Sequence, residues 1–467
     1  MERFVFYDFE TSGAKPAFDQ ALQFAAIVTD DNFNELDRME LRCQLSPHIL
    51  PSPIALHVTG VRPGQLLNSN LMNQFEFAQR LQSLIKTWAP AVWIGYNSIQ
   101  FDEEVMRHLF YQNLQPTIYA TQRWGNSRLD AMKMIWAVYD KAPNVLIWPT
   151  NKNGLTSFKL DQLAPANGFI THNAHDAMGD TEAMIFVLEK IRSGAPSLYD
   201  QLVANNNKHH VKNLLGSFKP VEITLRFGAS EPKTYVGCFC GSENGNPNRI
   251  GFFDLTQDNA FDLINGSQKD IEDALSGSPK KIRTLALNRA DTFTEFEQAD
   301  ALHNLLCATI EENHEFRSKV SQTMADQYSD GDQDDKLVEE RIYDGFVSPT
   351  DQDLLIQFQS ATWRARQELV SVMEDARLRQ LGGRLIAFYA PELLNSEEKQ
   401  KFSKYICNKW SEMDKDVSWT TMDKVQIDLI RLKDKGVPRE ELSRLKRFYE
   451  ARFQQTGCEF YDWLLCA

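Results

Sequence analysis

With 467 residues, the chain is too long for one ordinary hydrophobic core, so we expect two or three domains. Its composition of 42% hydrophobic and 24% charged residues is typical of a globular protein, and its apolar runs fall short of the roughly 18–20 residues that cross a bilayer. The net charge of −14 argues against a generic polyanion binder, although it does not exclude a local basic groove.

The first 195 residues alternate strand and helix patterns, which predicts an α/β domain. The opening stretch MERFVFYDFE carries acids too early for a signal peptide and lacks a small-residue cleavage site, so we expect a cytoplasmic protein. The expected strands cover 3–10, 24–30 and 91–97, and the expected helices cover 75–88, 102–113, 158–168 and 177–194.

From about residue 220 the pattern changes to short strands separated by Gly, Asn and Pro turns. Strands are expected over 221–227, 234–241, 249–255 and 282–288, with one helix over 267–275. Cys238 and Cys240 fall in the second of these strands, where their alternation suits a strand better than a zinc site. This region is therefore expected to form a compact β-rich domain.

Helical patterns cover 295–327 and dominate again after residue 349. The acidic run 329–335 between them begins like a calcium loop, but Asp335 stands where such a loop needs Gly and Arg341 where it needs Glu. We interpret this run as an exposed linker. The expected C-terminal helices cover 353–374, 397–413, 422–436 and 438–457. The expected domains are 1–196, 197–345 and 346–467.

Asp8 and Glu10 stand two residues apart at the end of the first strand, in the segment YDFETSG. Side chains alternate along a strand, so the two carboxylates project from one face with Cα atoms roughly 7 Å apart. Two like charges so placed need compensation, and a divalent metal would supply it. For this pair alone, exposed acids at a strand end remain an alternative.

Three further residues favour the metal. Asp102 follows a short apolar strand at or near a helix start, where it could instead be an N-cap. Asp180 lies in a helix on the side of its apolar residues, where an unpaired carboxylate would be costly. His175 precedes it by five residues and could reach the same site, whereas Asp176 is a rival ligand whose position suits a cap better.

These motifs resemble the DEDD exonucleases of the ribonuclease-H-like fold, in the subclass that carries His before the last Asp. The likeness to the bacterial exodeoxyribonuclease I family extends over nearly the whole chain and is more diffuse between about residues 220 and 340. It rests on YDFETSG, IGYNSIQFDEEVMRHLFYQN, NSRLDAM, LTSFKLDQLAPANG, NAHDAMGD and YDGFVSPTD. The resemblance implies an α/β, ribonuclease-H-like exonuclease domain with a mixed sheet, an SH3-like β-rich domain and a C-terminal helical domain.

The same resemblance implies an activity. It implies a processive 3′→5′ exodeoxyribonuclease that degrades single-stranded DNA to 5′-mononucleotides in DNA repair or recombination. Asp8, Glu10 and Asp180 would bind a pair of Mg²⁺ ions, for which Mn²⁺ could substitute, and Asp102 would hold the second ion partly through water. His175 would act as general base on the attacking water, since its ordinary pKa lies near neutrality.

Substrate contacts are expected along the path of the strand, and each could instead be an ordinary surface residue. Glu10 is expected to contact the substrate, and Arg107 should point near the site because it lies five residues after Asp102 in the same expected helix. The family pattern implies further contacts for Asn126, Arg128, Lys159 and Lys208. The stretch 201–221 contains no acid but several Lys and His residues, which suits either a phosphate-facing surface or a solvated face. Asp130 is expected to be structural. Gln122 and Ile118 stand where aromatic residues would be expected, so base stacking should differ in detail.

Two alternatives differ in class. An RNA-directed exonuclease of the family would be a short single-domain chain, and nearly 270 residues beyond the catalytic domain speak against it. An inactive single-stranded-DNA-binding scaffold would not need the four acids and the His. Expected partners are single-stranded DNA and the C-terminal tail of single-stranded DNA-binding protein, with no membrane; we expect a monomer.

Overall fold

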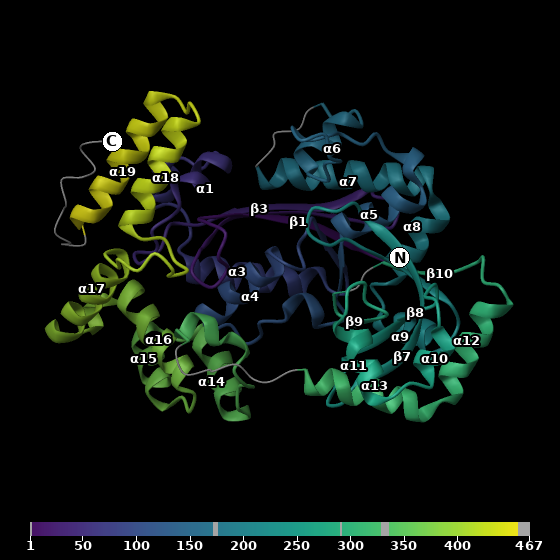
Figure 1. Cartoon of the computed structure of the whole chain (residues 1–467). Coiled ribbons are helices and arrows are strands. Elements are labelled where there is room, and N and C mark those ends of the chain that lie inside the picture. Colours follow the sequence, from purple (N-terminus) through teal and green to yellow (C-terminus); the bar gives the residue numbers. More distant parts are fainter. Residues whose placement is uncertain (1, 171–175, 290–291, 328–335, 456–467) are drawn as a thin grey trace.

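The computed structural model describes residues 2–170, 176–289, 292–327 and 336–455 (Figure 1). The predicted general base His175 and the acidic run 329–335 lie outside these residues. None of the described helices combines the length and apolar content that a membrane crossing requires.

The first sheet has five strands in the order β3-β2-β1-β4-β5. The pairs β1–β2 and β2–β3 are antiparallel, whereas β1–β4 and β4–β5 are parallel. This mixed sheet confirms the predicted fold class of a ribonuclease-H-like exonuclease domain. Its strands are β1 Phe4–Thr11, β2 Ala21–Thr29, β3 Glu35–Arg42, β4 Val92–Gly95 and β5 Ser127–Asp130. The sequence pattern did not predict β3, which is largely exposed at the sheet edge.

Helices cover both faces of the first sheet. On one face, Phe4 and Phe6 of β1 pack with side chains of α5 and α7. On the other face, Val5 and Tyr7 pack with side chains of α3 and α4. The helices of this region are α1 Pro53–Val58, α2 Pro63–Leu66, α3 Gln74–Trp88, α4 Asp102–Gln112, α5 Ala131–Lys141, α6 Leu160–Ala166, α7 Ala177–Gly194, α8 Pro196–Ala204 and α9 Lys208–Gly216, with short 3₁₀ turns at η1 Ala120–Gln122 and η2 Pro143–Val145.

The second sheet is antiparallel throughout, in the order β10-β6-β7-β8-β9. It agrees with the β-rich region expected after residue 220, and Cys238 and Cys240 are buried in β7. Its strands are β6 Val221–Leu225, β7 Lys233–Glu243, β8 Asn246–Asp254, β9 Ile282–Ala286 and β10 Phe293–Glu295, and its helices are α10 Ala260–Ile264, α11 Gln268–Ser276, α12 Ala301–Glu312 and α13 His314–Asp326. Helix α13 packs against β7.

The remainder of the chain is helical, as predicted. The single helix expected over 353–374 is wrong: the chain breaks at Ala361, and the Thr362 side chain caps a new helix by accepting from the Ala365 N–H. Helix α16 was not predicted. The elements are η3 Val338–Tyr343, α14 Pro349–Ser360, α15 Trp363–Val372, α16 Ala376–Tyr389, η4 Pro391–Leu393, α17 Ser396–Trp410, α18 Met422–Asp434 and α19 Arg439–Gln455.

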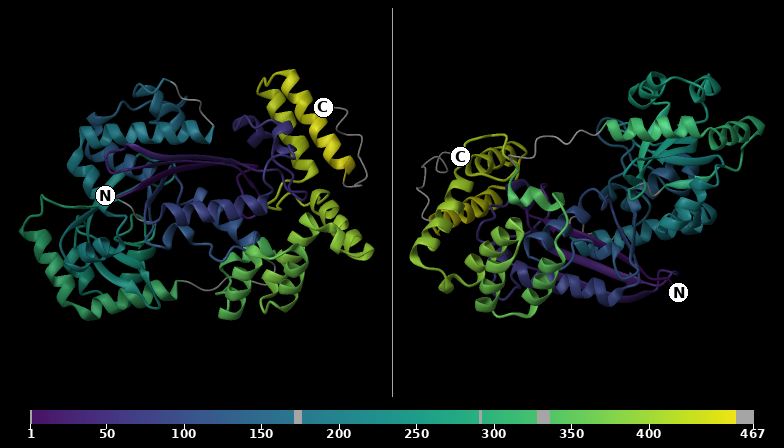
Figure 2. Two further views of the ribbon diagram at one scale, coloured as in Figure 1. Left: turned by 180° about the vertical axis from the view of Figure 1, so that it is seen from behind. Right: turned by 90° about the horizontal axis from the view of Figure 1, so that it is seen from below.

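The first sheet lies between the other two regions (Figures 1 and 2). The C-terminal helices share a hydrophobic core with it, in which Leu22 and Leu45 pack with Trp410 and Tyr449. The Trp410 indole donates to the His48 carbonyl at 3.0 Å. The two regions are therefore held together by a common core as well as by the chain.

Candidate metal centre and substrate pocket

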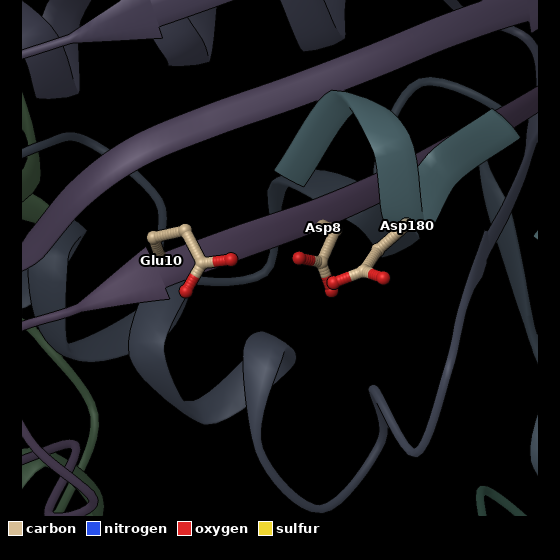
Figure 3. Close-up of side chains that lie close together, drawn as sticks. All are labelled: Asp8, Glu10 and Asp180. Carbon is tan, nitrogen blue, oxygen red and sulfur yellow. The ribbon is translucent and has the colours of Figure 1, made fainter. Parts of the chain in front are cut away.

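The first strand presents two of the predicted ligands on one face. Phe4, Phe6, Asp8 and Glu10 alternate with residues that point to the opposite core, so the acids continue the face that α7 covers. Figure 3 shows the carboxylates of Asp8 and Glu10 close to that of Asp180. The strand therefore presents both acids on the face of the sheet that packs against α7.

Asp180 supplies that third carboxylate from the first turn of α7. One oxygen each of Asp8, Glu10 and Asp180 lie within 4.8 Å of one another. The rival Asp176 stands at the N-cap position, but its side chain makes no capping hydrogen bond there. It accepts instead from the Arg42 guanidinium at 3.1 Å and from the Gln23 amide at 3.0 Å. The geometry thus places Asp180, and not Asp176, in the cluster.

Asp102 is the first residue of α4 and is almost completely buried. It is not one of the three residues in the tight cluster, but its charge raises the pKa of both Asp8 and Glu10. The N-cap position of α4 belongs to Phe101, so the capping alternative for Asp102 does not hold. Asp102 therefore lies near the cluster without belonging to it.

Burial and mutual repulsion raise the pKa values of these acids. Burial is the largest cause for Asp8, followed by the charges of Asp102, Glu10 and Asp180, and its pKa lies well above the usual range. Burial and then Asp180 and Asp102 raise the pKa of Glu10 to about 9. Burial raises the pKa of Asp102 to about 8. Carboxylates with raised pKa values gain most from a bound cation, because the cation offsets both the cost of burying the charges and their mutual repulsion.

In the metal-free protein, stability should fall as the pH rises from about 5 to about 9. The folded pKa values of Glu10 and Asp102 lie above their ordinary values of 4.5 and 3.8, so the folded state holds protons that the unfolded state has released. The stability that these protonated groups contribute is fully present below about pH 4. It is lost as the pH rises through their pKa values in the folded protein. Thermal unfolding in EDTA would measure it, and added Mg²⁺ should restore stability. A melting temperature that rises steadily to pH 9 in EDTA would contradict this.

The ligand set fits a hard divalent cation. Three carboxylates and no Cys offer the oxygen atoms that Mg²⁺ and Mn²⁺ prefer. Asp8, Glu10 and Asp180 could hold one ion, and Asp102 could contribute to a second.

A pocket of about 500 Å³ opens beside the cluster. Asp8 and Asp180 form part of its wall, and the predicted contact Lys159 is exposed in another part. Lys208 is exposed at the first position of α9 and does not line this pocket. The complete lining is Asp8, Tyr96, Asn97, Met132, Asn151, Thr156, Ser157, Phe158, Lys159, Leu160, Asp161, Asp180 and Arg226.

The other expected contacts have partners within the protein. Arg107 pairs with Glu104 at 2.9 Å and donates to the Tyr343 hydroxyl at 3.1 Å. Arg128 pairs with Glu103 at 2.8 Å. The buried Asn126 amide accepts from the Ala91 N–H and donates to the Ala120 carbonyl. These three residues therefore hold the scaffold in this structure, and their contact with substrate stays a prediction.

Glu103 is a buried residue beside the acids that the sequence did not single out. It lies next to Asp102 with 1% exposure and accepts hydrogen bonds from the Tyr7 hydroxyl at 3.0 Å and the Thr121 hydroxyl at 2.9 Å, besides its pair with Arg128. The network ties β1 to α4 behind the acids. Asp130 is structural as predicted, since it caps α5 and accepts from the Asn97 N–H.

Comparisons with known proteins agree with this geometry. A family model described as Exonuclease matches residues 5–188, and one described as Exonuclease I C-terminal domain matches residues 333–451. The chain is 30% identical to exodeoxyribonuclease I of Escherichia coli K12 over 424 residues, which cover 85% of this chain and 88% of the relative.

Solved structures give the same result over almost the full length. The exonuclease I from Methylocaldum szegediense superposes with a TM-score of 0.78 at 26% identity and covers 97% of this chain and 100% of its own. The E. coli exonuclease I in complex with a dT13 oligonucleotide gives a TM-score of 0.79 at 25% identity, with coverages of 97% and 99%. The chain therefore belongs to the exodeoxyribonuclease I family.

Proposed function

We propose that the chain is a 3′→5′ exonuclease that hydrolyses single-stranded DNA to 5′-mononucleotides. The observation that carries the proposal is the convergence of Asp8, Glu10 and Asp180 beside a pocket, in a chain of this family. A solved relative binds a dT13 oligonucleotide, which supports single-stranded DNA as the substrate class. DNA repair or recombination is the process in which such an activity would serve.

Each part of the site would have a defined role in phosphodiester hydrolysis. Asp8, Glu10 and Asp180 would hold Mg²⁺, with Mn²⁺ as a substitute, and Asp102 would take part in binding a second ion. Bound divalent ions neutralise charge on the phosphate and on the leaving oxygen and activate water. Lys159 would bind a phosphate in the pocket, and His175 would accept the proton of the attacking water.

The rest of the chain would serve the substrate. The second sheet, expected to be SH3-like, and the C-terminal helices would enclose the strand and make degradation processive without a basic overall charge. We further propose that the protein acts as a monomer in the cytoplasm and binds the C-terminal tail of single-stranded DNA-binding protein. One similar solved structure contains SSB and exonuclease I with an inhibitor.

A degradation assay with matched strands tests the proposal. In Mg²⁺, a 5′-labelled single-stranded DNA should shorten progressively from its 3′ end, whereas EDTA should stop the reaction. An RNA strand of the same sequence should be degraded much more slowly. Faster loss of the RNA would favour the RNA-directed alternative, and absence of digestion under any divalent metal would favour the inactive scaffold.

A further inference from the structure

Arg226 brings a cation from the second sheet into the catalytic pocket. It directly follows β6, and of the described residues that line the pocket it is the one from beyond residue 196. Its guanidinium lies 4.7 Å from the ring centroid of Phe158, which lines the same pocket next to Lys159. A segment more than 200 residues from Asp8 in sequence thus forms part of the same wall.

The stem of Arg226 is fixed while its charge remains available. Its Nε donates to the Ser230 carbonyl at 2.8 Å, and the guanidinium also stacks near Trp136 at 5.8 Å. In the described part of the chain, no acid lies within ion-pair distance of its terminal nitrogens. Stacking on an aromatic ring orients a guanidinium without neutralising it. The group is therefore preorganised to receive an anion.

Contacts between the two regions hold this loop in place. Glu222 of β6 pairs with Lys141 of α5. The Thr234 N–H donates to the Asp140 carboxylate at 2.8 Å, and Glu231 accepts from the Thr156 hydroxyl at 3.2 Å. Because these contacts flank Arg226 on both sides in sequence, its position relative to the carboxylates is set by the fold before any substrate arrives.

The charges in the pocket are divided in a way that matches a nucleic acid end. Asp8, Asp161 and Asp180 contribute negative charge, and Lys159 and Arg226 contribute positive charge. A strand whose 3′ end lies at the acids would place a neighbouring phosphate within the pocket. A fixed cation there can bind this phosphate, and Arg is suited to it because its fork matches phosphate oxygens.

We propose that Arg226 binds a backbone phosphate of the substrate strand in the catalytic pocket, so that the second sheet supplies part of the substrate site itself. This inference rests on the proposed function, since it takes the pocket to hold single-stranded DNA. Arg226 is thus a substrate-binding residue in addition to those that the sequence indicated.

Binding of a labelled dT oligonucleotide to the full chain in EDTA, where digestion does not proceed, tests the inference. Arg226→Met keeps an apolar stem over Phe158 but removes the charge. It should weaken binding about 10-fold and reduce the slope of log affinity against log salt by about 0.7. Arg226→Lys should keep the slope. In Mg²⁺, Arg226→Met should raise KM with little change in kcat.

Lys269→Gln is the matched control, because it removes one exposed cation from α11 of the same region without touching the pocket. Equal affinity and salt slope for Arg226→Met and Lys269→Gln would overturn the inference. Thermal unfolding shows whether each variant is folded; if Arg226→Met is not, Arg226→Gln is judged by the same criteria. A wild-type chain that binds DNA but digests none would instead count against the proposed function alone.

Discussion

Asp8→Asn should lower the rate of single-strand degradation by about 10³-fold or more and at the same time stabilise the metal-free protein by about 1–3 kcal/mol. The substitution removes a proposed metal ligand, which explains the first effect. It also removes a carboxyl group whose pKa is raised by burial and by the charges of Asp102, Glu10 and Asp180, so the folded protein no longer has to hold a proton there, which explains the second. Initial rates in Mg²⁺ and thermal unfolding in EDTA measure the two effects on one preparation.

Asp176→Asn is the control for this experiment. Asp176 lies only four residues before Asp180 in sequence but pairs with Arg42, so its loss should leave activity within a few-fold of wild type and should not stabilise the protein. Asp180→Asn should match Asp8→Asn in activity. If Asp176→Asn were inactive and Asp180→Asn active, the assignment of the third carboxylate would be reversed.

Glu103→Ala should destabilise the protein by about 3–5 kcal/mol, because it leaves the buried Arg128 cation unpaired and the Tyr7 and Thr121 hydroxyls without their acceptor. Activity should fall as well, since the network holds β1 against α4 at the acids. Thermal or urea-induced unfolding, with the rate measured at a temperature where the variant is folded, checks both expectations.

An exposed ion pair provides the comparison. Glu182 pairs with Arg38 at 2.6 Å, and both side chains are about 40% exposed. Glu182→Ala should therefore cost less than about 1 kcal/mol. A loss for Glu103→Ala no larger than this would show that the buried network contributes little to stability.

The acids of the site were predictable because their placement depends on local periodicity. Alternation along β1 puts Asp8 and Glu10 on one face, and the helical period of α7 puts Asp180 on the side of its buried residues Met184 and Val187. Each of these two placements follows from the period of one element alone, without knowledge of the element that packs against it. The meeting of the two elements was not predictable in this way and came from the resemblance to the family.

The parts that were missed depend on tertiary neighbours or on unusual local composition. Glu103 looks like a helix-start acid, and only Tyr7, Thr121 and Arg128 make it a buried hub. Strand β3 was not predicted because, at the edge of the sheet, it carries mostly charged residues. Helix α16 was not predicted because Gly382 and Gly383 at its centre weaken the helical pattern. Arg226 gives no local signal, because the other residues that line its pocket all lie 46 or more positions earlier in the sequence.

The core shared by the first sheet and the C-terminal helices has a consequence for how this enzyme can be shortened. Leu22, Leu45 and Leu56 are covered by Trp410, Leu429 and Tyr449, so they are buried only when both ends of the chain are present. A fragment ending near Ala195 would keep every described carboxylate of the site but would expose this apolar surface to water and tend to aggregate. The first 195 residues are therefore not a detachable module, and minimal versions of the enzyme have to retain or redesign that face.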